Sequence, residues 1–148
     1  MSAKTISFRS FSVVVPERWE DITSSLHSDS TVLTIADPHS GVGAIQFSPA
    51  VYTGGPSPNV SIEVLSGLFE EFLKGQQYSE RFDNTSRPGV IATVGASLRD
   101  DNDFIRIWYL SDGNNVLLVS YVCEWNSRHF ETQTREDIVE SIEFTSQY

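Results

Sequence analysis

Three apolar segments separated by turn-forming residues define the second half of the chain. The segments are Val90–Leu98, Phe104–Leu110 and Val116–Cys123. Between them stand Asp100–Asn102 and Asp112–Asn115, whose Asp, Asn and Gly residues tolerate the positive φ angles that tight hairpins require. The pattern therefore predicts an antiparallel meander of three strands.

Each strand of this meander carries apolar residues on both of its faces. In the middle strand the two alternating sets are Phe104, Trp108 and Leu110 on one face and Ile105, Ile107 and Tyr109 on the other. A strand of this kind has to be covered on both sides. We therefore expect the α+β fold class, in which a central antiparallel β-sheet carries helices and loop segments packed on its faces.

Two segments with helical periodicity supply this cover. The first begins after Ser61, a favourable N-cap residue, and ends near Gln76. The second begins near Asn126 or Ser127 and ends near Ile142. The apolar stripes are Ile62, Leu65, Leu68, Phe69, Phe72 and Leu73 in the first helix and Phe130, Thr134, Ile138, Val139 and Ile142 in the second.

The first half of the chain predicts further strands. Ile6–Val15 is interpreted as one strand with a bulge or bend at Arg9–Ser10, where the alternation changes phase. Pro16 ends this strand because proline cannot continue a central ladder. Thr31–Ala36 and Ala44–Ser48 are predicted to form a hairpin across a connection rich in turn formers.

Two connections complete the predicted order of elements. Pro49–Asn59 is expected to be a long irregular loop, since it contains Gly54-Gly55-Pro56-Ser57-Pro58. Glu80–Asn84 is predicted to be a short strand, and Ser86–Gly89 a turn that leads into the meander.

Composition and charge limit the classes of function. The 148 residues suit a single globular domain spanning positions 1–148. The formal net charge of −10 argues against nucleic acid and anionic membranes as partners, because both attract clustered Lys and Arg. The charge is compatible with a basic protein partner, or with an acidic surface that serves only solubility.

The N-terminal residues and the cysteine content favour a cytoplasmic protein. Arg9 interrupts the apolar stretch that a secretory signal requires, so no such signal is expected. Cys123 is the only cysteine, which excludes an intramolecular disulfide. Its position in an apolar strand predicts an inert core thiol.

The chemistry-bearing residues form no catalytic constellation. His27, His39 and His129 are far apart and lack the spacing of zinc ligands. His39 shares a turn with Asp37, but no G-x-S-x-G motif accompanies the pair. The acidic run Asp100–Asp103 lacks the Gly and the distal Glu of an EF-hand loop. We therefore expect no enzymatic activity, no cofactor and no metal.

Three segments are candidates for contact with a protein partner. The first is the long Gly/Pro loop, because loops of this length are more often functional than short ones. The others are the two acidic turns, which lie at opposite ends of the predicted sheet because one strand separates them. The candidate residues are Tyr52, Gly54, Gly55, Asp100, Asp101, Asp103, Asp112 and Asn114.

The Trp108 face of the meander is the candidate for a small-ligand site. It holds Phe104, Arg106 and Trp108, and an Arg amid aromatic rings either stacks on them or binds a carboxylate. The alternative is that the guanidinium extends out of the core edge into solvent. Across the hairpin, the preceding strand offers small residues on one face. They leave room for a pocket, a flat interface or a closely packed helix. These residues are Thr93, Gly95 and Ser97.

Two short motifs resemble the Mog1/PsbP-like family. They are Val15-Pro16-Glu17-Arg18-Trp19 and Ile138-Val139-Glu140-Ser141-Ile142-Glu143-Phe144. The order of the predicted elements between them also fits. The resemblance implies an α/β/α sandwich around an antiparallel sheet and an activity based on binding. Family members include a factor that engages a small GTPase, a photosystem accessory subunit, and small bacterial proteins that resemble immunity proteins of secreted toxins.

These observations predict a non-enzymatic, cytoplasmic, bacterial protein that engages a basic protein partner. Immunity-type neutralisation of a toxin is the narrower form of this hypothesis. The alternative is a small-ligand-binding protein with a pocket near Trp108 and Arg106.

Overall fold

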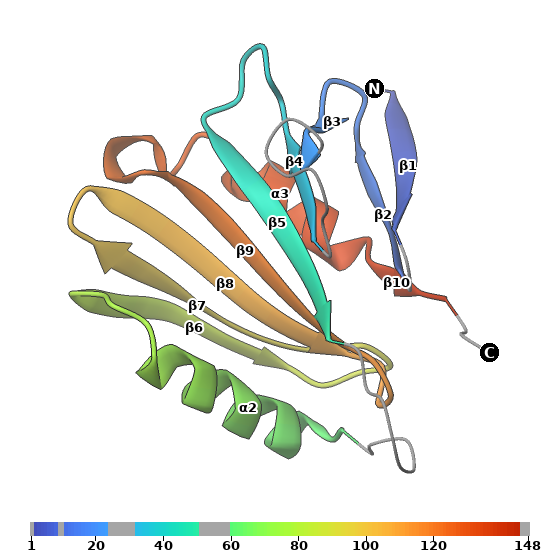
Figure 1. Ribbon diagram of the computed structural model, residues 1–148, viewed down its shortest axis with the longest axis vertical. Helices are drawn as coiled ribbons and strands as arrows, with labels where there is room; N and C mark the ends of the chain where they lie inside the picture. Colours follow the sequence, from blue (N-terminus) through green and yellow to red (C-terminus); the bar gives the residue numbers. More distant parts are fainter. Residues whose placement is uncertain (1, 9–10, 24–31, 51–59, 146–148) are drawn as a thin grey trace.

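A seven-stranded antiparallel sheet forms the centre of the protein (Figure 1). The computed structural model describes residues 2–8, 11–23, 32–50 and 60–145. In spatial order the strands are β3 (Glu20–Asp21), β4 (Leu33–Ala36), β5 (Gly43–Ala50), β9 (Val116–Glu124), β8 (Asp103–Ser111), β7 (Ala92–Asp100) and β6 (Glu80–Arg87). The predicted meander is confirmed, since β7, β8 and β9 are consecutive neighbours.

A second, three-stranded sheet consists of β1 (Ala3–Phe8), β2 (Phe11–Pro16) and β10 (Glu143–Phe144). The predicted single strand Ile6–Val15 is wrong, because β1 and β2 pair antiparallel with Phe8 opposite Phe11. The change of phase in the sequence therefore falls between two paired strands and not within one, while Arg9 and Ser10, where a bulge or bend was predicted, lie outside the described residues. A two-residue connection and a bulge shift the alternation in the same way, so the pattern does not separate them.

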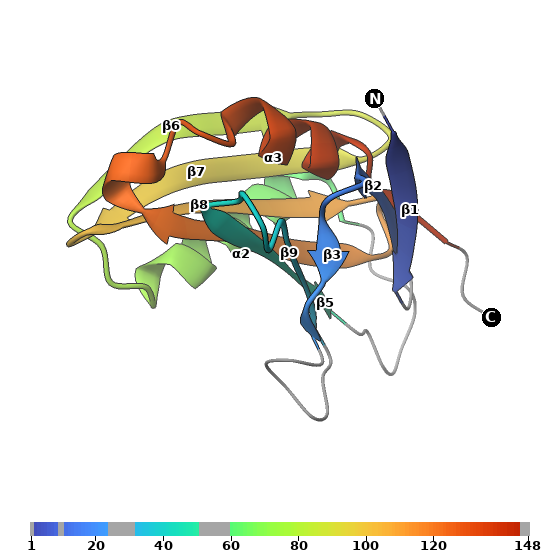
Figure 2. The ribbon, with the colours of Figure 1, turned by 90° about the horizontal axis from the view of Figure 1, so that it is seen from above.

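The helices and the small sheet cover the two faces of the large sheet. Helix α2 (Ile62–Lys74) packs on one face, and α3 (Thr132–Glu140) packs with the small sheet on the other (Figures 1 and 2). Two groups of buried apolar residues result, one under α2 and one under α3. The expected arrangement, an antiparallel sheet covered on both faces, is confirmed.

Helix α2 follows the sequence prediction closely. The Ser61 side chain accepts a hydrogen bond from the backbone N–H of Val64 at 3.2 Å, and Gly75 is the C-cap residue. Phe69 is buried at 2% exposure, as predicted. Leu68, predicted on the same face, is 45% exposed because it lies at the flank of the buried stripe.

The second predicted helix is shorter than expected. A 3-10 turn, Trp125–Ser127, precedes α3, which begins only at Thr132. Phe130 lies before the helix and is 78% exposed, so its predicted place in the apolar stripe is wrong. Ile138 and Val139 are buried as predicted.

The strand boundaries differ from the predictions in two places. Pro49 and Ala50 belong to β5 and pair with β9, although a loop was expected from Pro49 onward. The described pairing of β4 with β5 runs only from Leu33 opposite Phe47 to Ala36 opposite Ala44, so Pro49 lies outside it. Strand β6 extends to Arg87, which shortens the predicted turn after it.

Among the described residues, no helix combines the length and the apolar character needed to cross a membrane.

Candidate functional site

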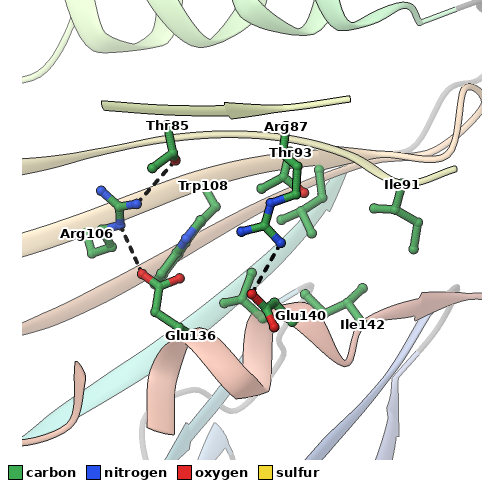
Figure 3. Close-up of a pocket in the computed structure, with 11 residues that line it drawn as sticks. Thr85, Arg87, Ile91, Thr93, Arg106, Trp108, Glu136, Glu140 and Ile142 are labelled. Atoms are coloured by element: carbon green, nitrogen blue, oxygen red, sulfur yellow. Dashed lines mark hydrogen bonds and ion pairs between the residues drawn. The ribbon is translucent and has the colours of Figure 1, made fainter. Parts of the chain in front are cut away.

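A pocket of about 490 Å³ lies between α3 and the strands β6, β7 and β8 (Figure 3). Its lining includes Arg106 and Trp108, two of the residues predicted for a small-ligand site. The volume falls within the range of small-molecule pockets, roughly 300–1,000 Å³. The lining residues are Thr85, Arg87, Ile91, Thr93, Arg106, Trp108, Leu110, Glu136, Val139, Glu140 and Ile142.

The register of the meander positions the inner end of this pocket. Trp108 pairs with Gly95, and Arg106 pairs with Ser97, two of the small residues that were predicted across the hairpin. A Cβ atom at Gly95 would lie 3.1 Å from Trp108 Cδ1 and 3.0 Å from Thr85 Oγ1. Glycine at this position therefore lets the indole ring lie against the sheet.

Arg106 is the most deeply placed polar residue of the pocket, with 4% exposure. Its Nη1 donates to the carbonyl oxygen of Asp83 at 2.6 Å and to Ser97 Oγ at 3.2 Å, and its Nη2 donates to Thr85 Oγ1 at 3.3 Å. The Nε atom is buried without a hydrogen-bond partner, because Glu136 Oε1 stands 3.6 Å away. The alternative of a guanidinium that extends into solvent is therefore excluded.

Burial and neighbouring carboxylates act on Arg106 in opposite directions. Desolvation lowers the pKa of its guanidinium, while Glu136 and Asp83 oppose that shift. An arginine stays protonated at physiological pH, so the group remains a buried cation. The Arg106 Cζ atom also lies 5.5 Å from the centre of the Trp108 ring.

The outer end of the pocket is closed by a second ion pair between the sheet and α3. Arg87 Nη1 lies 3.2 Å from Glu140 Oε1, and both side chains are more than half exposed. Figure 3 shows Glu136 and Glu140 reaching from α3 toward Arg106 and Arg87 on the sheet. The pocket thus has a buried cation at its inner end and a solvated ion pair at its rim.

Phe104, the third residue predicted for the ligand site, does not line the pocket. The Cζ atom of Arg135 lies 4.9 Å from the centre of the Phe104 ring, and this ring also packs against Trp125. Arg135 is buried on α3 and donates to the carbonyl oxygen of Arg128 at 2.8 Å, while its Nε has no partner. Burial and a 2.7 Å hydrogen bond to Glu131 raise the pKa of the nearby Tyr121 hydroxyl.

The two acidic turns lie at opposite ends of the sheet, as predicted. At one end Asp100 pairs with Asp103, and Asp103 pairs with Glu124 of the next strand. Side chains at paired positions share one face of a sheet, which here is the face that α2 packs on. We call Asp100, Asp103 and Glu124 the acidic row; Asp101 lies beside it in the turn, at φ 56°.

The turn at the other end uses its carboxylate internally. Asp112 accepts hydrogen bonds from the backbone N–H groups of Asn114 and Asn115 at 3.0 and 2.8 Å. Desolvation raises the pKa of Asp112, but these bonds outweigh it and hold the pKa below its usual value. Tyr52, Gly54 and Gly55, the other predicted partner residues, lie outside the described residues.

The remaining chemical candidates are structural. Asp37 accepts hydrogen bonds from the backbone N–H groups of His39 and Ser40, so its carboxylate closes its own turn. Cys123 is buried, as predicted, and burial raises the pKa of its thiol. No group of three potential metal ligands exists among the described residues.

Sequence reasoning missed several residues of these sites, among them Glu136, Glu140 and Glu124. Glu136 and Glu140 reach the pocket from α3, and their spacing of four places them on one helix face. That spacing was visible, but nothing local indicated which strands it faces. Glu124 follows from the turn lengths, which fix the position opposite Asp103.

The described residues define a class before any relative is considered, an α+β sandwich whose antiparallel sheet carries α2 on one face and α3 on the other. Neither protein-family models nor the sequences of curated proteins match the chain. Solved structures do. The Ran-binding protein Mog1p of Saccharomyces cerevisiae matches with TM-score 0.63 and 10% identity, over 97% of this chain and 95% of that one.

Two further structures agree. Cyanobacterial PsbP (CyanoP) from Synechocystis sp. PCC 6803 matches with TM-score 0.58 and 10% identity, over 97% of this chain and 92% of that one. A Bacteroides thetaiotaomicron protein matches with TM-score 0.69 and 12% identity over 99% of this chain, which spans 50% of its length. The chain therefore has the Mog1/PsbP-like fold, as its two end motifs indicated.

Proposed function

We propose that this chain is a non-enzymatic binding protein whose partner is a protein with a basic surface, and that the acidic row is part of the contact. The observation that carries the proposal is the arrangement of the row itself. Three carboxylates occupy directly opposed positions on three neighbouring strands. Like charges at opposed positions destabilise a sheet, so this arrangement is unfavourable for the isolated protein.

The cations of the chain do not offset this charge. Among the residues that the structure describes, no Lys, Arg or His forms an ion pair with Asp100, Asp103 or Glu124. Two arginines close to the row in sequence, Arg99 and Arg128, place their Cζ atoms 4.2 and 3.9 Å from the centre of the Trp125 ring. A basic partner would supply the missing counter-charge and relieve the repulsion.

The similar structures support binding as the general activity. One of them is described as a Ran-binding protein, which makes protein recognition a use of this fold in that case. A toxin domain neutralised in the cytoplasm by an immunity-type contact is the narrower form of the proposal. Basic nucleases and other cationic toxins would present the required surface.

The test is affinity capture from a lysate of the source cell with three baits. The first is the wild-type chain, and the second carries Asp100→Asn, Asp103→Asn and Glu124→Gln. The matched control carries Glu17→Gln, Glu63→Gln and Glu143→Gln, which removes the same three charges from exposed positions and shifts the formal net charge from −10 to −7 in both variants.

The proposal predicts that the wild type and the control both retain a basic protein. Salt should weaken this binding. The row variant should associate about tenfold more slowly at low ionic strength, because electrostatic steering is lost. Equal association rates for the two variants would show that the row acts only in solubility. Retention of a neutral or acidic protein would refute the basic partner.

A further inference from the structure

The pocket under α3 lies on the sheet face opposite the acidic row and is independent of it. The apolar part of its lining comes from Ile91, Trp108, Leu110, Val139 and Ile142, and the polar part from Thr85, Arg87, Thr93, Arg106, Glu136 and Glu140. Apolar and aromatic side chains combined with polar groups at fixed positions are typical of sites for small organic molecules. The apolar part of the lining therefore fits a flat apolar group.

The Nε–H of Arg106 has no hydrogen-bond partner. Arginine has five N–H donors, and three hydrogen bonds go to Asp83, Ser97 and Thr85, of which Nη2 makes only the one to Thr85. Nε and Nη2 form the edge of a guanidinium that binds a carboxylate with two parallel hydrogen bonds, and in Arg106 this edge is free at Nε. Glu136 faces this edge, but its 3.6 Å separation makes an ion pair without a hydrogen bond.

The buried charges under α3 are also unbalanced. Arg106 and Arg135 are both at least nine-tenths buried, and each has an Nε atom without a partner. The Glu136 side chain is 31% exposed and forms an ion pair with Arg106 at 3.6 Å, without a hydrogen bond. A buried cation is stabilised by a hydrogen-bonded anion, and leaving that partner out is costly. An anionic group placed on Arg106 would supply it.

We propose that this pocket binds a small monocarboxylic acid with a flat apolar body. The carboxylate takes the free edge of Arg106 and displaces Glu136 toward solvent, and the body lies on Trp108 between Leu110 and Ile142. Glu136 and Glu140 flank the opening, so polyanions such as organic phosphates are disfavoured. The Arg87–Glu140 pair spans the rim and must part for entry, at little cost because it is exposed.

The experiment compares two probes of the same shape, 2-naphthoate and its uncharged amide, 2-naphthamide. Binding is measured by titration calorimetry and by the chemical shifts of the tryptophan indole N–H groups, with the Trp108 signal assigned through Trp108→Phe. The acid should bind at least about tenfold more tightly than the amide, the effect of one charge-assisted hydrogen bond. The Trp108 signal should move more than those of Trp19 and Trp125.

Glu136→Gln separates the proposed geometry from general apolar binding. Removing the competing carboxylate should tighten 2-naphthoate binding about three- to tenfold and leave 2-naphthamide unchanged. Asp137→Asn is the control, since Asp137 is exposed on the same helix and does not line the pocket. Arg106→Gln should abolish the preference for the acid, provided its circular dichroism matches the wild type.

Three results would overturn the proposal. The first is an equal affinity for the acid and the amide. The second is that 2-naphthoate binds neither the wild type nor Glu136→Gln. The third is that the indole N–H chemical shift of Trp108 does not change on binding. Weaker acid binding by Glu136→Gln would also contradict it, because the carboxylate would then belong to the site. If Arg106→Gln fails to fold, the Glu136→Gln comparison alone decides. None of these outcomes depends on the acidic row or on a protein partner.

Discussion

The two faces of the seven-stranded sheet are covered in different ways. Under α2, Leu65 and Phe69 pack against an apolar surface of β7 and β8. Under α3, Ile138 packs into the core beside two buried guanidinium groups, those of Arg106 and Arg135. The core under α2 is apolar, whereas the α3 face combines an apolar core with buried charge and the larger described pocket.

The difference concerns where polar groups are buried. Apolar burial lowers the free energy of the folded state roughly in proportion to area, and the larger group of buried apolar residues lies on the α3 side. A buried guanidinium costs several kcal/mol in lost hydration, which its hydrogen bonds recover only in part. We therefore infer that both faces stabilise the fold and that polar chemistry concentrates under α3.

The largest expected effect breaks the α2 face. Phe69→Ala should lower the free energy of unfolding by about 3–5 kcal/mol, because it removes a buried ring and leaves a cavity. Its neighbour Leu68 is the matched control, since it is 45% exposed against 2% for Phe69. Leu68→Ala should cost less than about 1 kcal/mol. Urea unfolding checks both, and equal losses would contradict the assignment of α2 as a dry, apolar contact.

The next effect concerns the buried charge under α3. Arg106→Gln should cost about 2–4 kcal/mol, because it leaves Asp83, Ser97 and Thr85 without their donor. Most of this cost should not depend on Glu136. A double-mutant cycle with Glu136→Gln, measured by urea unfolding, should give a coupling below about 1 kcal/mol. A larger coupling would mean that the 3.6 Å ion pair closes to a hydrogen bond in solution.

The two helices also differ in how they begin. Ser61 caps α2 with its side chain, whereas Glu131, which precedes α3, makes no capping side-chain bond. Ser61→Ala should therefore lower the free energy of unfolding by about 1 kcal/mol. Thr132→Ala, at the exposed start of α3, should change it by less than about 0.5 kcal/mol. Similar losses in thermal or urea unfolding would mean that α3 is also held by its first turn.

The elements that sequence analysis found are those with local causes. The turns at Asp100–Asn102 and Asp112–Asn115 define the meander because their residue types favour tight turns. Helix α2 has both a cap and an apolar face. The β1–β2 hairpin was misread because Arg9–Ser10 contains no turn-forming glycine or asparagine. The start of α3 was misplaced because Phe130 continues the helical spacing without being buried.

The site could be predicted only where it lies on one hairpin. Alternation along β8 places Arg106 and Trp108 on one face, and the turn length places Gly95 opposite. The partners of Arg106 come from elsewhere, since Asp83 is in the irregular part of β6 and Glu136 is on α3. Docking of α3 depends on tertiary packing, which no local pattern in one sequence reveals.

The smallest expected effect concerns the acid sensitivity of the α2 side. There the turn between β8 and β9 contacts the start of α2, because the Val60 N–H donates to the Gly113 carbonyl oxygen at 3.0 Å. Hydrogen bonds keep the pKa of Asp112 below its ordinary value of 3.8 in the folded state. A lowered folded-state pKa adds stability that is present above the unfolded pKa and lost as pH falls through the folded one. Asp112→Asn keeps the turn without a titrating group.

The free energy of unfolding of the wild type should therefore fall relative to that of Asp112→Asn as the pH drops below about 4. The difference should stay under about 1 kcal/mol, because the carboxylate is only partly buried and its charge is screened by solvent. Urea unfolding at neutral pH and at several acidic values measures it. Parallel profiles for the two proteins would mean that the turn does not depend on the charge of Asp112, and that acid sensitivity arises at other carboxylates.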